Sequence, residues 1–237
     1  MKNNKFLIIG AGSYSKKDPL VKGIGTCLVE TLANERDLSV LFTYNQSKDG
    51  ADRLIREVQL EHPSFGVESF RFNSRNYNSE WRRLSSKLSQ FGTPRVFIYN
   101  SGLRYYKEHL SDSEKEETME VNYHCPIFLI EKIGERMVQD GIKGKIVLVG
   151  SILAGKHHPF LEDYCLSKGL LTKYVQENSA YWKAQGIEVS IISPNVTRTP
   201  MTEENMDLYE SEVRQGKRSK IFSPKEVAEE IAVMCFS

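Results

Sequence analysis

Tyr164 and Lys168, in the segment YCLSK, give the clearest sign of chemistry in this sequence. Helical spacing runs over 162–185, and residues i and i+4 of a helix share one face, with Cβ atoms about 5–6 Å apart. A phenol beside an ammonium can transfer a proton. The same spacing recurs at Tyr44 and Lys48. Those two straddle an expected strand end, so only the first pair is expected to act together.

Three further polar residues stand where they could complete such a pair. Ser151 follows the apolar run KIVLVG, and Asn100 closes the run VFIYN and is followed by Ser101 and Gly102. Asn122 lies in the long helical segment that precedes the Ser151 run. In open α/β sheets, ligands bind outside the carboxyl ends of the strands. Ser151 and Asn100 are therefore expected at one ligand-facing edge.

Glycines follow the first apolar run, FLII, in two groups. Gly10 and Gly12 come directly after it, and Gly23 and Gly25 open the next helical segment. Glycines let the backbone approach a phosphate closely, and a helix N-terminus supplies free N–H groups and a positive dipole. The pattern predicts a phosphate-binding loop, with ordinary turn glycines as the alternative.

The end of the second expected strand bears on the choice of nucleotide. An NAD-specific site favours Asp or Glu here, which holds the ribose 2′-hydroxyl and repels a 2′-phosphate. The segment TYNQSK has no carboxylate before Asp49, and Lys22 stands beside the glycines, with Lys16 and Lys17 in the adjacent loop. We therefore expect NADP (NADPH) as the preferred cofactor and NAD as the second choice. Simply solvated lysines are the alternative.

The alternation of short and long segments predicts the elements that position these residues. Short apolar runs fit buried parallel strands, and the segments between them have helical spacing. The series predicts an α/β fold, a Rossmann-type doubly wound parallel sheet with helices on both faces. One catalytic domain over 1–237 is expected, with 199–223 as a substrate lid, a binding loop or a disordered segment. The expected strands lie at 6–10, 38–44, 67–72, 96–100, 145–150 and 187–193, and the expected helices at 23–36, 48–61, 78–90, 112–139, 162–185 and 224–235.

Composition and charge exclude several classes of protein. The 32 Lys+Arg balance 31 Asp+Glu to a net charge of +1, so neither a nucleic-acid partner nor a membrane partner is expected. No apolar run approaches the roughly 20 residues that span a bilayer, and the run near Met1 is too short for a signal peptide. The four cysteines are far apart, which argues against disulfide scaffolds and zinc modules. A soluble, cytoplasmic chain is expected.

In combination, these segments resemble the single-domain short-chain dehydrogenases/reductases, among them the 3-oxoacyl-carrier-protein reductases. The matches follow the family order over essentially the whole chain. The matching segments are GAG…KGIG at 10–25, YNSG at 99–102, EVNYHCP at 120–126, VGS at 149–151, YCLSK at 164–168 and SPNVTRTPM at 193–201.

The resemblance implies a catalytic set of Asn122, Ser151, Tyr164 and Lys168 that reduces a carbonyl with hydride from a nicotinamide. Tyr164 would donate the proton and Ser151 would bind the substrate oxygen. Lys168 would bond the nicotinamide ribose, and Asn122 would hold a water that links it to solvent. An ammonium about 5 Å from the phenol, at an effective dielectric constant near 20, favours tyrosinate by about 3 kcal/mol. We therefore expect the pKa of Tyr164 to be lowered by about two.

The resemblance also implies the residues that bind the cofactor. Thr199 matches the threonine that holds the nicotinamide carboxamide, and Val196 matches the residue whose backbone approaches it. Asn195 replaces the family's glycine and tolerates positive φ better than most residues. The implied cofactor-binding residues are Gly10, Gly12, Lys22, Gly23, Ile24, Gly25, Tyr44, Asn45, Asn73, Asn100, Ser101, Gly102, Tyr164, Lys168, Pro194, Val196 and Thr199.

The first departure from the family pattern is an enlarged segment between Gly10 and Gly23. Tyr14, Lys16 or Lys17 in this segment could fold over the adenosine phosphates. A flexible surface insertion is the alternative.

Two other departures concern the adenine site and the assembly. Asn73 stands where the family has an aspartate that contacts adenine. After the helix expected at 224–235, the family's last strand is expected to be missing, and that strand helps to form a tetramer contact. A homodimer through the helices at 112–139 and 162–185, or a homotetramer, is expected.

Substrate-facing candidates lie in three segments, 103–106, 153–160 and 201–209. The adjacent His157 and His158 have no third ligand nearby, so no metal is expected. We expect an NADPH-dependent reductase of a small, possibly carrier-bound ketone, such as a 3-oxoacyl compound. A cofactor-binding regulatory or scaffold protein without turnover and an enoyl-type C=C reductase are the alternatives. The individual substrate candidates are Leu103, Leu153, His157, Phe160 and Met201.

Overall fold

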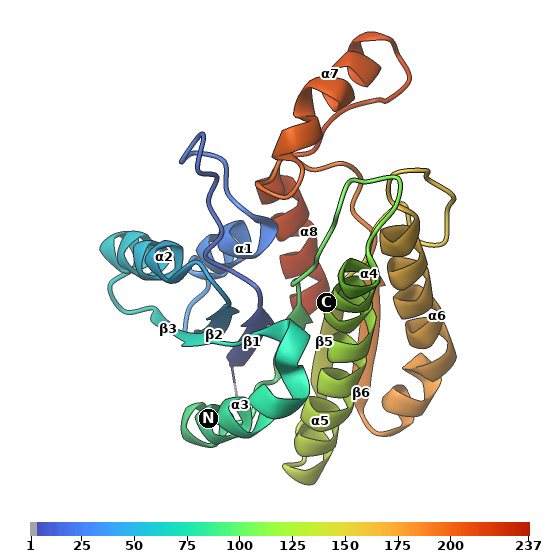
Figure 1. The fold of residues 1–237 in the computed structure, drawn as a ribbon. Helices are drawn as coiled ribbons and strands as arrows, with labels where there is room; N and C mark the ends of the chain where they lie inside the picture. Colours follow the sequence, from blue (N-terminus) through green and yellow to red (C-terminus); the bar gives the residue numbers. More distant parts are fainter. Residues whose placement is uncertain (1–3) are drawn as a thin grey trace.

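Six parallel strands form one sheet at the centre of the protein, which the computed structural model describes over residues 4–237 (Figure 1). The first three residues of the domain predicted over 1–237 therefore lie outside the described part. The strand order β3-β2-β1-β4-β5-β6 reverses its direction between β1 and β4. At such a reversal a crevice opens beyond the carboxyl ends of the strands. The strands are β1 (Lys5–Ile9), β2 (Ser39–Tyr44), β3 (Gly66–Arg71), β4 (Val96–Tyr99), β5 (Gly144–Val149) and β6 (Ile187–Ile192).

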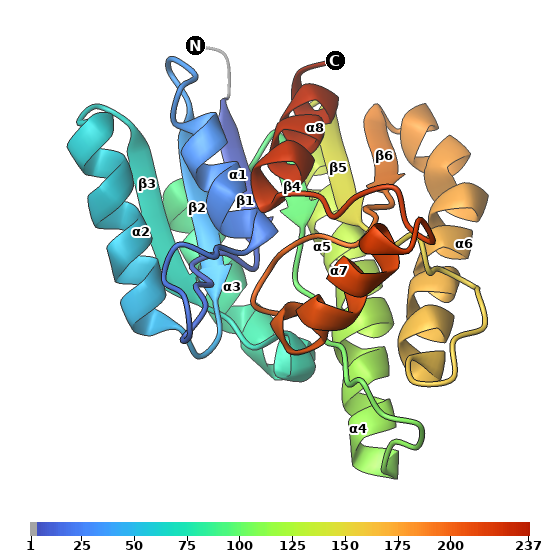
Figure 2. The same cartoon turned by 90° about the horizontal axis from the view of Figure 1, so that it is seen from above.

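The strands read as continuous apolar runs because helices cover both faces of the sheet. On one face, Ile8 and Phe42 are fully buried against the first layer of helices, and on the other, Leu7 and Leu41 are fully buried against the second. Figure 2 shows the two layers from above. The predicted Rossmann-type doubly wound sheet is therefore confirmed. The first layer comprises α1 (Ile24–Leu32), α2 (Lys48–Glu61) and α8 (Pro224–Phe236), and the second α3 (Tyr77–Phe91), α5 (Cys125–Gln139) and α6 (Glu162–Ala184).

The single helix expected at 112–139 is interrupted. Helix α4 (Asp112–Met119) begins at a capping box formed by Ser111 and Glu114, and a π-helical turn, η2 (Glu120–His124), connects it to α5. Pro126, in the first turn of α5, cannot donate to the carbonyl four residues earlier, and its ring crowds that carbonyl. The wider turn accommodates this proline, and Asn122 lies within it.

The segment expected to be a lid, a loop or disordered contains two helices. A short 3-10 turn, η3 (Glu203–Asn205), leads into α7 (Met206–Arg214). Figures 1 and 2 show α7 standing over the edge of the sheet at which the strands end. A backbone bridge between Thr197 and Phe222 closes the base of the segment before α8 begins. Helical structure over 203–214 is at odds with the alternative of a disordered segment; we call residues 199–223 the lid, and their role at a substrate site stays a prediction.

The enlarged segment after β1 is tied to its surroundings. The Arg53 guanidinium lies 4.1 Å from the centre of the Tyr14 ring, and the Tyr14 hydroxyl donates a hydrogen bond of 3.0 Å to Glu57. A backbone bridge joins Tyr14 to Lys22. The segment therefore forms a short hairpin held against α2. No helix among residues 4–237 has the length and apolar character that a membrane crossing requires.

Candidate active site

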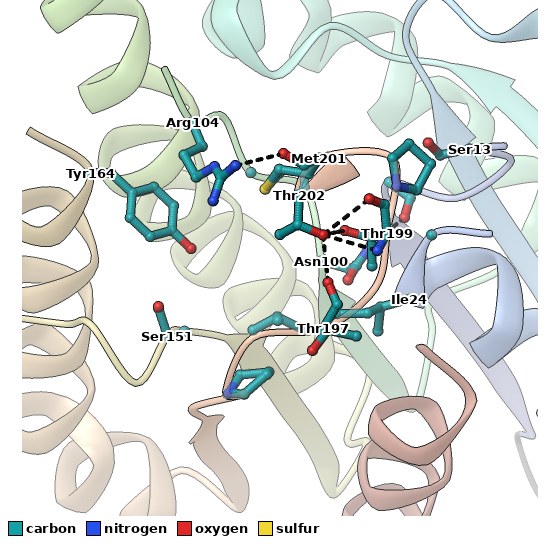
Figure 3. A pocket seen from close by; sticks show the side chains of 18 of the residues that line it. Ser13, Ile24, Asn100, Arg104, Ser151, Tyr164, Thr197, Thr199, Met201 and Thr202 are labelled. Atoms are coloured by element: carbon teal, nitrogen blue, oxygen red, sulfur yellow. Dashed lines mark hydrogen bonds between the residues drawn. The ribbon is translucent and has the colours of Figure 1, made fainter. Parts of the chain in front are cut away.

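A cavity of about 410 Å³ opens beyond the carboxyl ends of the strands, between the loops that follow β1, β2, β4, β5 and β6. Figure 3 shows several of its side chains converging on this space. Most of the residues predicted to bind cofactor or substrate lie in its wall. Those that do are Gly10, Gly23, Ile24, Tyr44, Asn45, Asn100, Ser101, Gly102, Ser151, Leu153, Tyr164, Lys168, Pro194, Val196, Thr199 and Met201.

The remaining predicted residues stand behind this wall or away from it. Asn122 and Leu103 support the wall from behind, through hydrogen bonds to each other. His157 and Phe160 lie on the exposed loop before α6, where Phe160 stacks on Tyr106. The structure thus does not bring these two to the cavity. The predicted residues that do not line it are Gly12, Lys22, Gly25, Asn73, Leu103, Asn122, His157 and Phe160.

The glycines after β1 allow α1 to begin against the strand. Gly10 has φ +96°, and a Cβ on Gly25 would lie 2.0 Å from the carbonyl oxygen of Gly10. No side chain caps α1 at Gly23, and its first turn carries no acidic residue. Free N–H groups and the positive end of the helix dipole therefore meet the cavity, an arrangement that suits a pyrophosphate. Gly12 instead packs against Ala51 of α2.

Lys22 is held by carboxylates rather than directed at the cavity. Its Nζ lies 2.7 Å from Glu30 and 3.7 Å from Glu57. The positive charge that we assigned to a 2′-phosphate is therefore already compensated. At the end of β2, Asn45 and Gln46 line the cavity, and no carboxylate stands there that would repel a 2′-phosphate.

Asn73 and Asn100 brace the cavity wall. Asn73 accepts hydrogen bonds from the backbone of Arg75 and, at 3.4 Å, from the Asn45 side chain, so it stands behind Asn45. The Asn100 side chain donates a bond of 2.6 Å to the carbonyl of Gly10. The ends of β1 and β4 are thereby joined where the sheet order reverses.

The hydroxyl groups of Tyr164 and Ser151 point toward one another across the cavity (Figure 3). Burial raises the pKa of Tyr164, and a hydrogen bond with Ser151 and the positive charge of Arg104 partly oppose this effect. This direction is opposite to the one we expected. The ammonium of Lys168 lies 6.0 Å from the centre of the Tyr164 ring, and burial of the phenol outweighs its neighbours.

Lys168 is the most deeply buried cation of the site, with 3% of its surface exposed. Its Nζ donates a bond of 2.8 Å to the carbonyl of Val149, and burial lowers the pKa of Lys168 to about 8. The ammonium thus sits at the floor of the cavity, where β5 ends. A cation there can bind a hydroxyl group that enters the cavity.

Asn122 is fully buried and links the loop after β4 to α6. Its Oδ1 accepts a bond of 2.8 Å from the N–H of Leu103, and its Nδ2 donates to the Leu103 carbonyl and, at 3.1 Å, to Ser167. Ser167 in turn donates to the carbonyl of Tyr164. Asn122 therefore joins the loop after β4 to helix α6, which carries Tyr164.

Ser13 lines the cavity without having been singled out from the sequence, and Thr202 lines it from within the candidate segment 201–209, where its role was not predicted. The Thr202 hydroxyl donates a bond of 2.6 Å to the carbonyl of Thr197 and accepts one of 3.0 Å from the N–H of Thr199 (Figure 3). It thereby fixes the turn through which the chain enters the lid. The signal was present in TRTPMT, since threonines around a proline favour such hydroxyl-to-backbone turns.

Metal ligands do not gather among residues 4–237: no three His, Cys, Asp or Glu side chains lie together there. His157 is exposed and lies 3.9 Å from the Glu162 carboxylate. All four cysteines are free and buried.

Comparison with known proteins agrees with this geometry. The family model for short chain dehydrogenases matches residues 20–209. Glucose 1-dehydrogenase 2 of Bacillus subtilis (strain 168) is 26% identical over 216 residues, which cover 87% of this chain and 81% of that protein. A 3-oxoacyl-[acyl-carrier-protein] reductase of Buchnera aphidicola subsp. Acyrthosiphon pisum is 22% identical over 207 residues, 86% of this chain and 82% of that protein.

Solved structures share the fold. A 4-hydroxyisoleucine dehydrogenase complexed with NADH has a TM-score of 0.80 at 23% identity, covering 97% of this chain and 90% of its own. A short-chain dehydrogenase from Sphingobium yanoikuyae in complex with NADPH has a TM-score of 0.77 at 20% identity, covering 97% and 83%. Since the family model spans most of the sequence, this chain belongs to the short-chain dehydrogenases, NAD(P)-dependent oxidoreductases that act on CH–OH and C=O groups.

Proposed function

We propose that this enzyme reduces a ketone to a secondary alcohol with NADPH, and that Tyr164 donates the proton. The observation that carries the proposal is the convergence of the Tyr164 and Ser151 hydroxyls on one cavity (Figure 3), with Lys168 at its floor. A substrate carbonyl between the two hydroxyls could accept a hydrogen bond from each.

The wall of the cavity suits a dinucleotide along its whole length. The uncapped start of α1, at Gly23 and Ile24, fits the pyrophosphate, and Asn45 fits the adenosine ribose. Lys168 and Thr199 lie where the nicotinamide half would extend. When bound, the nicotinamide supplies the hydride. The preference for NADPH over NADH rests on the absence of a carboxylate at the end of β2, since Lys22 is paired elsewhere.

The raised pKa of Tyr164 favours the direction of reduction. A phenol whose pKa lies above its ordinary value stays protonated at neutral pH and can therefore donate. Ser151 orients the carbonyl and, by hydrogen bonding, stabilises the tyrosinate left after transfer. The Lys168 ammonium adds positive charge behind the phenol.

The substrate is proposed to be a small ketone, free or carrier-bound. The named relatives act on sugars and on 3-oxoacyl groups, so their names favour no one class. Assembly into a homodimer or homotetramer is proposed from the exposed apolar residues of α6, Leu166 and Tyr181. A cytoplasmic location is proposed because all four cysteines are free, as is usual in a reducing compartment.

Fluorescence titration with NADPH and NADH, followed by a panel of ketones and alcohols, tests the proposal. Tyr164→Phe should lower turnover by about 10²–10⁴-fold, the usual contribution of a general acid, while cofactor affinity stays unchanged. Tyr181→Phe, on the exposed side of the same helix, is the matched control and should retain full turnover. Undiminished turnover in Tyr164→Phe would remove this residue from the mechanism. Tight cofactor binding without hydride transfer on any panel compound would favour a protein without turnover.

A further inference from the structure

Arg104 extends from the loop after β4 into the cavity wall beside Tyr164 (Figure 3). Its Nη1 donates to the Tyr209 hydroxyl at 2.9 Å, and its Nη2 donates to the carbonyl of Met201 at 3.0 Å and to Oδ1 of Asn205 at 2.6 Å. All three acceptors belong to the lid, and all three are neutral. The guanidinium is thus fixed in place without charge compensation from its partners.

Other arginines of the same region do have counterions. Arg198 lies 2.6 Å from Glu210, and Arg218 lies 2.8 Å from Glu212. No carboxylate pairs with Arg104 among residues 4–237. The cavity wall offers none either, because its charged side chains, Arg104 and Lys168, are both cations. The cavity therefore attracts negative charge.

The guanidinium also keeps unused hydrogen-bonding capacity. Nε of Arg104 is buried and has no hydrogen-bond partner. An arginine has five N–H donors, and the lid takes up three bonds. Since solvent does not reach Nε, the donor left for a ligand in the cavity is the second N–H of Nη1, and a carboxylate or phosphate is the acceptor that a guanidinium binds best.

We propose that Arg104 binds an oxyanion group of the substrate, a carboxylate or a phosphate, and so selects ketones that carry one. The inference rests on the proposed function and specifies its substrate class. In the reaction, the carbonyl carbon receives hydride from NADPH and the carbonyl oxygen receives the proton of Tyr164. The products are the secondary alcohol and NADP⁺, and the oxyanion group is unchanged.

The same bonds connect substrate charge to the lid. Because Arg104 holds Met201, Asn205 and Tyr209, an oxyanion that joins its guanidinium from the cavity side meets the lid in the arrangement that these bonds fix. A neutral substrate leaves the second N–H of Nη1 without an anionic partner. Discrimination therefore arises from a contact that only the anionic substrate makes.

Matched substrate pairs test the assignment. Acetoacetate is compared with methyl acetoacetate, and dihydroxyacetone phosphate with dihydroxyacetone, at constant ionic strength. We expect kcat/KM to favour the anionic member of at least one pair, and Arg104→Gln to remove about 10- to 100-fold of that advantage, the worth of a hydrogen bond between charged groups. The pair that responds distinguishes a carboxylate from a phosphate.

Control variants separate charge recognition from a general loss of the lid. Arg104→Lys keeps the charge and should restore part of the advantage. Arg198→Gln removes a cation that directly precedes the lid and does not line the cavity, so this variant should keep all of the advantage.

A binding measurement covers the case in which none of these ketones reacts. Malonate and inorganic phosphate are titrated into the protein with and without NADPH, and malonamide is the neutral control. Binding of either anion that weakens at least 10-fold in Arg104→Gln supports the proposal. Equal affinity in the wild type and this variant, or equal turnover of both members of each pair in the wild type, overturns it. In that case Tyr164-dependent turnover of neutral ketones would leave the proposed function intact.

Discussion

Replacing Lys168 with methionine should change how stability depends on pH. Lys168 is buried at the floor of the cavity, and its amino group contacts the carbonyl of Val149. Burial lowers the pKa of Lys168 from 10.5 to about 8. The folded protein therefore releases this proton more readily than the unfolded chain does.

The sign and size of the effect follow from this difference. Between pH 8 and 10.5 the unfolded chain binds more protons at this position, so rising pH stabilises the folded wild type relative to Lys168→Met. At 1.36 kcal/mol per pKa unit, the difference between 10.5 and about 8 amounts to about 3 kcal/mol over that window. The lost bond to Val149 adds an offset that does not vary with pH.

Urea unfolding of both proteins from pH 7 to 10.5 measures the difference in their free energies of unfolding. That difference should be flat near pH 7 and then rise by about 3 kcal/mol in favour of the wild type. Lys173→Met, which removes an exposed lysine from the same helix, should follow the wild-type profile. A flat or falling difference for Lys168→Met would refute the assignment of Lys168 as a cation destabilised by burial.

Two further predictions concern the cofactor half of the cavity. Gly25→Ala should destabilise the fold by about 1–3 kcal/mol, as overpacking does, because the new Cβ would overlap the carbonyl of Gly10. Thermal unfolding measures this loss of stability. An unchanged unfolding midpoint would contradict the close approach of α1 to β1. Lys22→Met should change the ratio of NADPH to NADH affinity by less than about twofold, because the Lys22 ammonium is paired with Glu30. Asn45→Asp should lower NADPH affinity at least about tenfold, because the new carboxylate would repel the 2′-phosphate. Fluorescence titration gives both ratios, and a large loss of NADPH preference in Lys22→Met would return that lysine to the cofactor site.

The sheet could be predicted from the sequence because its strands are buried on both faces. A run such as FLII has no polar residue that could face water, so its position along the chain is nearly fixed. Because Ser151 and Asn100 each follow a parallel strand, they could then be placed at the same edge of the sheet. Tyr164 and Lys168 followed from the spacing of one uninterrupted helix.

The direction of side chains in loops could not be predicted in the same way. Lys22 stands beside the glycines in the sequence, but Glu30 and Glu57, from two different helices, draw its ammonium away from the cavity. The π-helical turn had a readable signal in Pro126, which removes one backbone donor from the middle of a helical pattern. The pKa of Tyr164 depends on how much of the phenol is buried, and spacing between two residues does not contain that information.

The lid joins the two halves of the site through contacts that no motif contains. On the cofactor side, the hydroxyl of Ser15, in the hairpin after β1, donates a bond of 2.5 Å to Glu203. On the substrate side, Arg104 bonds to Asn205, two residues later. The same short turn of the lid is therefore held from both sides. Since the enlarged hairpin supplies one of these contacts, its insertion is better understood as a support for the lid than as a loop free in solvent.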